Sequence, residues 1–334
     1  MIRPLAITLA ILSLPGAFAQ QVLSVRSGLI HHVEGKVLLD ERPLKIETGK
    51  FPMVEIGKTL ATAADSRAEL LLTPGAFLRL ADNSSVKMHA SSLSNAIVEL
   101  VSGAALVEVA ELSKEHRVAV KVGDSETSLL KAGLYMFDAT RGAVRVFDGK
   151  AQMRMSGAML TLTRGREARL GPEIIAAKFD RKKTDGLYQW SLVRSNMLAT
   201  ANLSVAGDLR SSGYRGYSGG WAWCPALGLM TFLPYNGYIR SPFGFGYYSP
   251  GGLWRYYADQ DARRQASSGG GYGGNGDSSW GGWNGGGGGY RGSGVDRSSS
   301  SSSGAVFSDS GGAARASAPA AAPAQSSPGG ARSR

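Results

Sequence analysis

The side chains that most often carry catalysis or bind metals are few in this sequence and far apart. The four histidines are His31, His32, His89 and His116. Because His31 and His32 are neighbours, on a strand they would point to opposite faces and would not share one metal ion. No histidine pair has the spacing of a zinc site, and the single cysteine, Cys224, allows neither an intramolecular disulfide nor a cysteine-based metal site. We therefore predict no metal and no cofactor.

Sequence motifs of catalytic folds are also missing. The chain has no Gly-x-Ser-x-Gly nucleophile elbow and no glycine-rich loop that ends in Lys-Ser or Lys-Thr. The carboxylate pairs Asp40-Glu41 and Asp180 with Asp185 stand in loop-like or helix-capping contexts. Glycoside hydrolysis would need two carboxylates that face each other across a cleft. We expect a protein that is not an enzyme.

Aromatic residues gather in a segment rich in glycine and proline, residues 205–266. Because Gly and Pro interrupt the rings, we expect extended stretches laid across another surface, with the rings as contacts. Four aromatic residues could form a platform for a glycan such as peptidoglycan: Trp221, Trp223, Tyr235 and Trp254. Packing within the chain or adhesion to other envelope proteins is the leading expectation for these rings, and the glycan platform is the alternative.

The elements that must position these residues are mostly strands. From residue 28 to residue 171 the chain consists of short apolar runs separated by Gly, Asp, Asn and Ser. Many runs alternate with period two, as where Val118, Val120 and Val122 flank Ala119 and Lys121, which is the pattern of a half-buried strand. Turn signals recur about every 8–12 residues, which is typical of a sandwich, barrel or solenoid. The predicted fold is mainly β.

A single amphipathic helix is predicted to follow, over residues 179–204. Asp185 can cap its N-terminus, and Arg194 lies one turn after Trp190, so its stem could cover the indole ring. The expected role of the helix is to pack on the β-domain as a lid, and partner docking is the alternative. The predicted apolar stripe comprises Leu187, Trp190, Val193, Met197, Leu198 and Ala201.

The N-terminus has the layout of a secretory signal peptide, residues 1–19. A positive charge at Arg3 precedes an apolar stretch, Pro15-Gly16 breaks it, and Ala17 and Ala19 supply the small residues before a cleavage site at Gln20. The apolar stretch is about half of the roughly 20 residues that a membrane-spanning helix needs. We therefore expect a periplasmic or secreted protein without a transmembrane helix.

The C-terminal tail, residues 267–334, is of low complexity and is predicted to be disordered. Most long glycine runs among the 46 glycines of the chain lie there, followed by a serine run and an Ala/Pro/Ser end. Such a composition buries too little apolar surface to offset chain entropy. The net charge of +11 is spread along the chain, which favours diffuse solubilising charge over one basic arm. With only two Arg/Gly/Tyr tripeptides in the chain and an export signal, we expect no nucleic acid as a partner.

The order of several motifs in the β-rich span resembles the FecR domain, a periplasmic module. The similarity runs from about Gly57 to Gly171, with residues 20–56 as additional N-terminal strands. Where the family often has Gly-Thr-x-Phe, this chain reads Gly133-Leu134-Tyr135-Met136-Phe137. The matching pieces are Leu60-Ala61-Thr62, residues 66–72, residues 74–80, residues 100–109, residues 144–149 and residues 162–170.

The resemblance implies a FecR-like fold of many short strands, solenoid-like or sandwich-like, in an envelope setting. It also implies signalling across the envelope for members with a membrane span and a sigma-factor-binding part. Here a cleavable signal stands in that place. We therefore expect a non-enzymatic exported scaffold or interaction module whose aromatic and glycine-rich tail contacts the cell wall or partner proteins. A glycan- or peptidoglycan-binding module is the first alternative, and an envelope signalling component related to FecR sigma-factor regulators is the second.

Overall fold

Residues 27–46, 49–171, 174–213, 217 and 219–268 are described by the computed structural model. They belong to one of the two units into which the chain divides, the unit that ends at Tyr272. The predicted signal peptide, residues 1–19, and residues 269–334 of the predicted tail lie outside the described residues.

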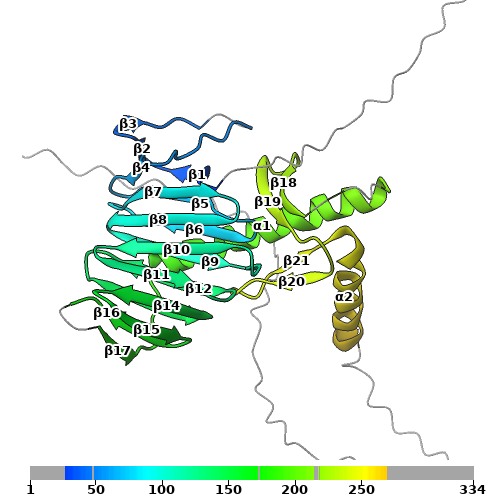
Figure 1. Cartoon of the computed structure of the whole chain (residues 1–334). Helices are drawn as coiled ribbons and strands as arrows, with labels where there is room; N and C mark the ends of the chain where they lie inside the picture. Colours follow the sequence, from blue (N-terminus) through cyan, green and yellow to red (C-terminus); the bar gives the residue numbers. More distant parts are fainter. Residues whose placement is uncertain (1–26, 47–48, 172–173, 214–216, 218, 269–334) are drawn as a thin grey trace, which may run out of the picture. The chain divides into compact units, whose positions relative to one another are not determined.

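Two β-sheets form the main part of this unit (Figure 1). The eight-stranded sheet has the order β1-β5-β6-β9-β12-β13-β16-β17, and the nine-stranded sheet has the order β15-β14-β11-β10-β8-β7-β4-β2-β3. The strands of the eight-stranded sheet are β1 (Leu29–Glu34), β5 (Arg67–Leu71), β6 (Ala76–Leu80), β9 (Ala104–Val109), β12 (Gly133–Asp138), β13 (Ala143–Asp148), β16 (Arg166–Arg169) and β17 (Ile175–Lys178). Those of the nine-stranded sheet are β2 (Val37–Leu39), β3 (Arg42–Pro43), β4 (Thr59–Thr62), β7 (Ser85–Ser92), β8 (Asn95–Ser102), β10 (Arg117–Val122), β11 (Ser125–Leu129), β14 (Lys150–Met155) and β15 (Ala158–Thr163).

The chain moves from one sheet to the other as it advances. The hairpins β5–β6, β12–β13 and β16–β17 belong to the eight-stranded sheet, and the hairpins β7–β8, β10–β11 and β14–β15 belong to the nine-stranded sheet. The described strand pairs are antiparallel except β8 with β10, which are parallel. The prediction of a mainly β fold of many short strands is confirmed, and the two sheets face each other across one core.

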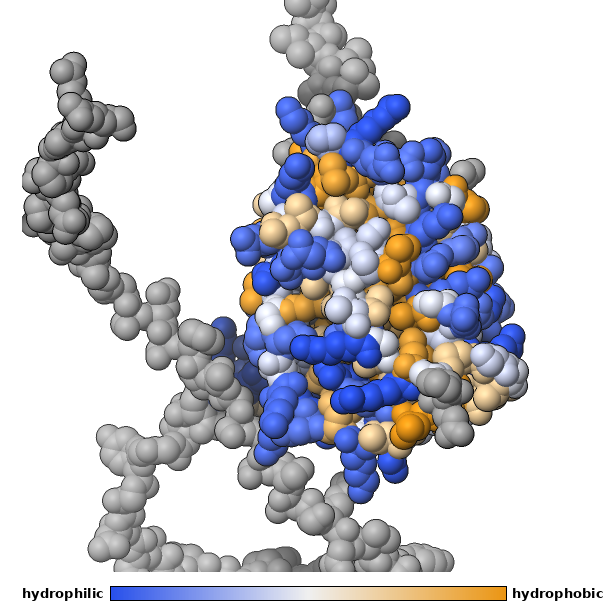
Figure 2. Space-filling view, turned by 90° about the vertical axis from the view of Figure 1, so that its left-hand side faces the viewer, coloured by the Kyte–Doolittle hydropathy of each residue, from blue (hydrophilic) through white to orange (hydrophobic). Residues whose placement is uncertain are grey.

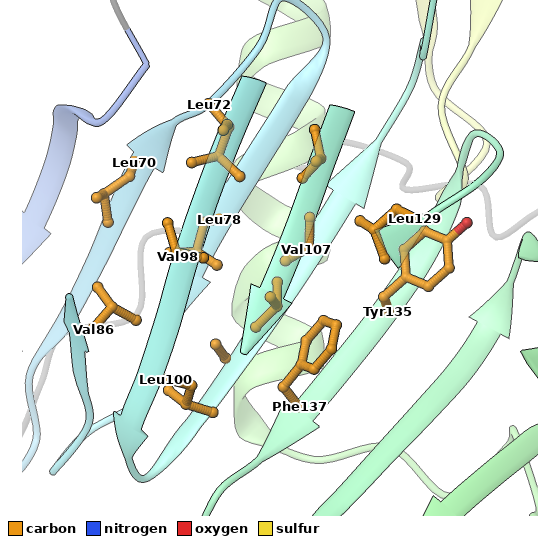
Figure 3. Packing of buried hydrophobic residues seen from close by; sticks show 14 of the residues in the cluster. Leu70, Leu72, Leu78, Val86, Val98, Leu100, Val107, Leu129, Tyr135 and Phe137 are labelled. Atoms are coloured by element: carbon orange, nitrogen blue, oxygen red, sulfur yellow. The ribbon is translucent and has the colours of Figure 1, made fainter. Parts of the chain in front are cut away.

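That core is made by the inward side of each period-two strand. Leu70, Leu78 and Val107 of one sheet meet Val86 and Val98 of the other (Figure 3). Each of these side chains is at most 1 % exposed. At about 25 cal/mol per Å² of apolar surface removed from water, this interior is the main source of stability.

One corner of the core is built around the Tyr135 side chain of β12. The Tyr135 hydroxyl donates to the carbonyl of Lys131 at 2.7 Å and accepts the amide N–H of Lys150 at 3.1 Å. Burial raises the pKa of this phenol to about 12. Gly149 has a φ of 97°, and a Cβ there would lie 2.2 Å from the hydroxyl oxygen. The turn at Gly149 therefore requires glycine both for its backbone conformation and for the space that the phenol occupies.

The helix α1 (Gly186–Ser211) packs on the outer face of the eight-stranded sheet. Asp185 caps it as predicted, since its Oδ1 accepts the N–H of Tyr188 at 2.9 Å. The helix begins later than the predicted 179–204, because the N–H of Phe179 still bonds to Gly165 and so extends the β16–β17 ladder. It also ends later, because Val205 and Leu209 continue its buried face.

The buried face of α1 includes Leu187, Trp190, Leu198 and Ala201 of the predicted apolar stripe but not its other two residues. Val193 and Met197 are 57 % and 42 % exposed, whereas Arg194 is buried. Arg194 does not cover Trp190. The guanidinium over that indole belongs to Arg67, at 5.7 Å from the ring centroid. The Nε1 of Trp190 donates to Glu34 of β1 at 2.8 Å and fastens the start of the helix to the sheet.

The described part of the aromatic segment is folded onto the same side of the sheet. It forms the hairpin β18 (Gly220–Cys224) with β19 (Leu229–Leu233), the pair β20 (Tyr238–Arg240) with β21 (Gly246–Tyr248), a 3₁₀ turn (Pro250–Gly252) and α2 (Leu253–Ser268). We call α1 together with these elements the C-terminal layer (Figure 1). Extended stretches laid across another surface were predicted here, but α2 is a second helix beyond the single one expected. No helix within the described ranges is both long and apolar enough to cross a membrane.

The outside of the unit is mixed in character. Figure 2 shows one side, on which hydrophobic residues form small groups that hydrophilic residues interrupt. The exposed large apolar residues include Val101 of β8, Met159 of β15 and Ile175 of β17. They lie on different elements, as is ordinary for a protein surface.

Candidate functional site

A cluster of charged side chains lies between the eight-stranded sheet and the C-terminal layer. Glu69 of β5 stands directly opposite Arg79 of β6, and Glu108 of β9 lies on the same face. Arg79 donates from Nε to Glu69 Oε2 and from Nη1 to Glu108 Oε2, both at 2.7 Å. The three side chains are 0 % exposed. The outer face of the sheet thus carries a buried row of alternating charge.

The C-terminal layer completes this row. Arg194 of α1 donates from Nη2 to Glu69 Oε1 at 2.7 Å, and the hydroxyl of Ser195 donates to Glu108 Oε1 at 2.7 Å. On the other side, Nδ1 of His31 lies 2.8 Å from Glu69 Oε1. We call the six residues the buried charge network: His31, Glu69, Arg79, Glu108, Arg194 and Ser195.

The hairpin β18–β19 is also attached to this network. The backbone N–H of Met230 in β19 donates to Nε2 of His31 at 2.9 Å. Since Nε2 accepts a hydrogen bond, the proton of the neutral ring sits on Nδ1, where it is donated to Glu69. His31 therefore connects β1, β5 and β19 at one point.

The electrostatics of the network follow from burial and pairing. Burial alone would raise the pKa of Glu69, but Arg194, Arg79 and His31 outweigh it and hold that pKa well below its usual range. Burial would lower the pKa of Arg79, yet Glu108 and Glu69 raise it. Burial lowers the pKa of His31 despite its bond to Glu69. The network is thus two carboxylates, two guanidiniums and a neutral imidazole, and its charges balance.

This arrangement contains a serine, a histidine and carboxylates, but their connections differ from those of a hydrolase. In a nucleophilic triad the serine hydroxyl bonds to the histidine that will take its proton. Here Ser195 donates to Glu108, and the Nε2 that would act as the base already accepts from Met230. The side chains of His31 and Glu69 are 0 % exposed. The geometry suits a fastening between layers rather than proton transfer to a substrate.

A second group of contacts fastens the C-terminal layer to itself. Asn202 of α1 donates from Nδ2 to the carbonyls of Phe232 and Tyr248, at 2.9 and 3.0 Å, and accepts the N–H of Tyr248 at 2.7 Å. The hydroxyl of Thr231 donates to the carbonyl of Leu198 at 2.6 Å. One amide side chain therefore satisfies three backbone groups on β19 and β21.

The four predicted binding residues have different surroundings. Trp221 is 2 % exposed, and its ring packs 5.3 Å from that of Phe77. Trp223 is half-buried against Phe51. Tyr235 is 71 % exposed and Trp254 is 61 % exposed. The structure thus uses Trp221 for packing, and the binding prediction now depends on Tyr235 and Trp254.

The segments that carry these two exposed rings are adjacent. The N–H of Ser249 donates to the carbonyl of Gly237 at 2.9 Å, which holds the turn after β19 beside the start of α2. Gly252 packs closely against the backbone of Gly237. Tyr235 and Trp254 therefore belong to one region of the surface.

The buried charge network was missed by the sequence analysis, although the sequence carries a signal for it. Arg79 stands between Leu78 and Leu80, and Glu108 stands between Val107 and Val109. A charge inside an apolar strand requires a partner if its outer face is covered. Opposite charges in three such runs could have indicated one buried cluster on a covered face.

Comparison with known proteins identifies the central part of the fold. No curated protein sequence matches the chain. Two crystal structures of a candidate anti-sigma factor from Parabacteroides distasonis ATCC 8503 match it in part. One is 15 % identical with a TM-score of 0.34 and covers 40 % of this chain and 64 % of that chain. The other is 16 % identical with a TM-score of 0.32 and covers 37 % of this chain and 61 % of that chain. This chain thus matches less than two thirds of the length of either.

The family model described as FecR protein matches residues 58–152. These residues run from just before β4 into β14 and include Glu69, Arg79 and Glu108. Residues 58–152 of this chain are thus similar to the FecR family.

Proposed function

We propose that this protein is a non-enzymatic, exported component of the cell envelope, in which the FecR domain serves as a scaffold for interactions with other molecules. The observation that supports this most is the buried charge network. The residues of this network are of types that often act in catalysis, but here they form hydrogen bonds with one another at 2.7–2.8 Å and are buried. The ionisable groups of the buried charge network therefore hold the C-terminal layer on the sheet.

The contact surface of this scaffold is proposed to include Tyr235 and Trp254. Both rings are mostly exposed and lie on adjacent segments of the C-terminal layer. Aromatic side chains with one face in solvent are typical anchors for proteins and sugars. Contact of this surface and of the tail with envelope proteins is the leading interpretation. Contact with peptidoglycan, which would make the protein a glycan-binding module, is the first alternative.

A role in envelope signalling is the second alternative. The match of residues 58–152 to the FecR family supports it, since FecR proteins act with protein partners at the envelope. Under this alternative the FecR domain would bind a signalling partner rather than a structural one.

One experiment separates these roles. The purified protein is sedimented with insoluble peptidoglycan and compared with the variant Tyr235→Ala/Trp254→Ala. The control is Val193→Ala/Met197→Ala, which removes two exposed apolar side chains from α1. The glycan-binding alternative predicts sedimentation of the protein and of the control but not of the aromatic variant. Equal sedimentation of all three would exclude the aromatic pair as the glycan platform.

The same residues also test the leading interpretation. A photocrosslinking residue at position 235 or 254 is expected to give protein adducts in the envelope fraction, and the same residue at position 193 is the control. Mass spectrometry of the exported protein is expected to find Gln20 at its N-terminus. An intact N-terminus together with a cytoplasmic protein would contradict the export part of the proposal.

A further inference from the structure

The edge strand β17 of the eight-stranded sheet is uncovered, as is the edge strand β15 of the nine-stranded sheet within the described residues, but the two differ in charge, since β15 contains no charged residue. At the opposite side of the eight-stranded sheet, the segment before β4 covers β1, since Ile30 donates to the carbonyl of Pro52 and Val54 donates to that of Gly28. The nine-stranded sheet ends on one side at β3, which has two residues, one of them Pro43, and on the other side at β15, which pairs only with β14. Likewise, β17 pairs only with β16, and its four residues are all exposed. It presents an uncovered strand (Figure 1).

The register shows which backbone groups of β17 are available. Phe179 donates to the carbonyl of Gly165, so this pair is hydrogen-bonded. Hydrogen-bonded and non-hydrogen-bonded pairs alternate along an antiparallel ladder. Ile175 and Ala177, which pair with Arg169 and Glu167, therefore bond to β16. Ala176 and Lys178 direct their N–H and C=O groups to the free edge, where a further strand could bond to them.

Positive charge surrounds this edge. Arg166 of β16 and Lys178 of β17 are directly opposite each other. Like charges in this position destabilise a sheet, and in the described part of the chain neither residue pairs with a carboxylate. The acid that follows Arg166 in β16, Glu167, is already bonded to Arg145 and Arg169. Residues 150–187 contain nine Lys and Arg against four Asp and Glu.

Hydrophilic side chains project from the lower end of the body in Figure 2, where Figure 1 places β15, β16 and β17. Further exposed cations follow β17 directly, at Arg181, Lys182 and Lys183. The edge therefore combines free hydrogen-bonding groups with an excess of positive charge.

We propose that β17 binds an acidic, extended segment of a partner protein, which adds to the eight-stranded sheet as a further strand. Strand addition uses the backbone groups of an exposed edge for affinity and its side chains for specificity. The cations favour an acidic partner. They also disfavour pairing with a second copy of this edge, because Arg166 and Lys178 would then face the same positively charged residues. This inference rests on the proposed interaction role and specifies the chemistry of one partner.

The binding test uses defined peptides on the purified protein. The probe is a fluorescent peptide of about eight residues, an ordinary strand length, with glutamate and valine in alternation. One control peptide has lysine in place of glutamate, and the other has the acidic sequence with alternate backbone nitrogens methylated, which removes hydrogen-bond donors but keeps the charge. Fluorescence anisotropy is expected to show binding of the unmodified acidic peptide alone. Equal binding of the methylated peptide would show polyanion binding and would overturn strand addition, as would no binding of the acidic peptide.

Two pairs of variants locate the site. Ala176→Pro removes an N–H at the free edge without removing a bond to β16, and Ala176→Val is its matched control. The proline variant is expected to weaken peptide binding about tenfold, since proline both removes a donor and obstructs the incoming strand. Equal affinity of the two variants would contradict the proposal, and if the proline variant fails to fold, the methylated peptide on the unchanged protein decides.

The second pair tests the charge. Arg166→Glu/Lys178→Glu is expected to lose the acidic peptide and to gain the lysine peptide. Lys45→Glu/Lys114→Glu, in the loops after β3 and β9, makes the same change in net charge and is expected to keep the original preference. A reversed preference in both double variants would assign the effect to overall charge and would overturn the site. Because these assays involve neither export nor the aromatic pair, their outcome is independent of the tests of the proposed function.

Discussion

At the scale of single residues, the main feature of this protein is a set of ionisable groups that are buried and paired with one another. Breaking a buried ion pair by removing one partner is costly because the other charge remains desolvated. Arg194 is the member that joins the helix to the sheet, through its bond to Glu69. Its neighbour Val193 is 57 % exposed.

The substitution Arg194→Met is therefore expected to lower the free energy of unfolding by about 3–5 kcal/mol. Methionine keeps the length of the side chain but leaves Glu69 with one cation fewer. Val193→Ala, one position earlier on the exposed face, is expected to change the free energy by less than about 0.5 kcal/mol. Urea unfolding measures both, and similar losses in the two variants would contradict the structural role of the network.

His31 predicts a dependence of stability on pH. The His31 ring is hydrogen-bonded to Glu69 of β5 and to the N–H of Met230 of β19. The charges of Arg194 in α1 and of His32 in its own strand also act on it. Its pKa in the folded state lies below the ordinary value of 6.5. As pH falls below 6.5, the unfolded chain takes up a proton that the folded ring refuses, so the free energy of unfolding decreases. Protonation of Nε2 would also break the hydrogen bond that this nitrogen accepts from the N–H of Met230.

The substitution His31→Gln is the matched test, because an amide can donate to Glu69 and accept from Met230 without titrating. Unfolding free energies of both proteins are measured at a series of pH values. The difference between them is expected to change from pH 6.5 downward. Both proteins are expected to lose further stability below pH 4.5, where Glu69 and other carboxylates with lowered pKa values take up protons in the unfolded state first. A constant difference between the two curves would show that His31 does not report on pH.

At the scale of elements, the C-terminal layer depends on α1 as its support. The N-terminal half of α1 packs on the sheet through Leu187 and Trp190. Its C-terminal half packs on the hairpins through Leu198 and Val205. Asn202 stands in the second half and bonds to β19 and β21 at once. Secondary structure of three to five residues, such as β18 to β21, is not stable without such contacts.

The substitution Asn202→Ala leaves three buried backbone groups without a partner. An unsatisfied buried group costs about 1–3 kcal/mol, so we expect a loss on the order of 3 kcal/mol in the free energy of unfolding. Hydrogen exchange should show a loss of protection of similar size in β19, β21 and β12, because the layer and the sheets are expected to unfold together. A loss confined to β19 and β21 would indicate that the layer opens by itself.

At the scale of the described unit, the C-terminal layer shares hydrophobic clusters with the outer face of the eight-stranded sheet, and these are separate from the core between the two sheets. Phe77 of β6 packs against Trp221 of β18 and Tyr247 of β21, at ring-centroid distances of 5.3 and 6.4 Å. Contacts of this kind couple the unfolding of neighbouring elements. A layer held only at its rim would open separately.

We accordingly expect the most protected amides of β19 to exchange with the same free energy as those of β9 and β12 in the unchanged protein. Native-state hydrogen exchange at several low denaturant concentrations measures this. If the amides of β18 and β19 exchange through an opening of much lower free energy than those of the sheets, the C-terminal layer unfolds independently. It would then not belong to the cooperatively folded scaffold.

The sequence by itself determined the class of this fold and several of its local features. Period-two runs such as Val118 to Val122 identify strands because one face of each must be apolar, and that requirement acts within a few residues. The cap at Asp185 and the turn at Gly149 are local for the same reason. The FecR resemblance came from the order of such local pieces.

The tertiary structure alone decided which faces are covered. The same alternation that buries Leu78 turns Arg79 outward, and only the position of α1 and β19 makes that outward face an interior. For this reason Trp221 was predicted as a contact residue and is a core residue, and Arg194 was expected to cover an indole and instead neutralises Glu69. Burial depends on which segments distant in sequence pack together, here residues 69 and 194, and no periodicity within one strand or helix encodes that choice.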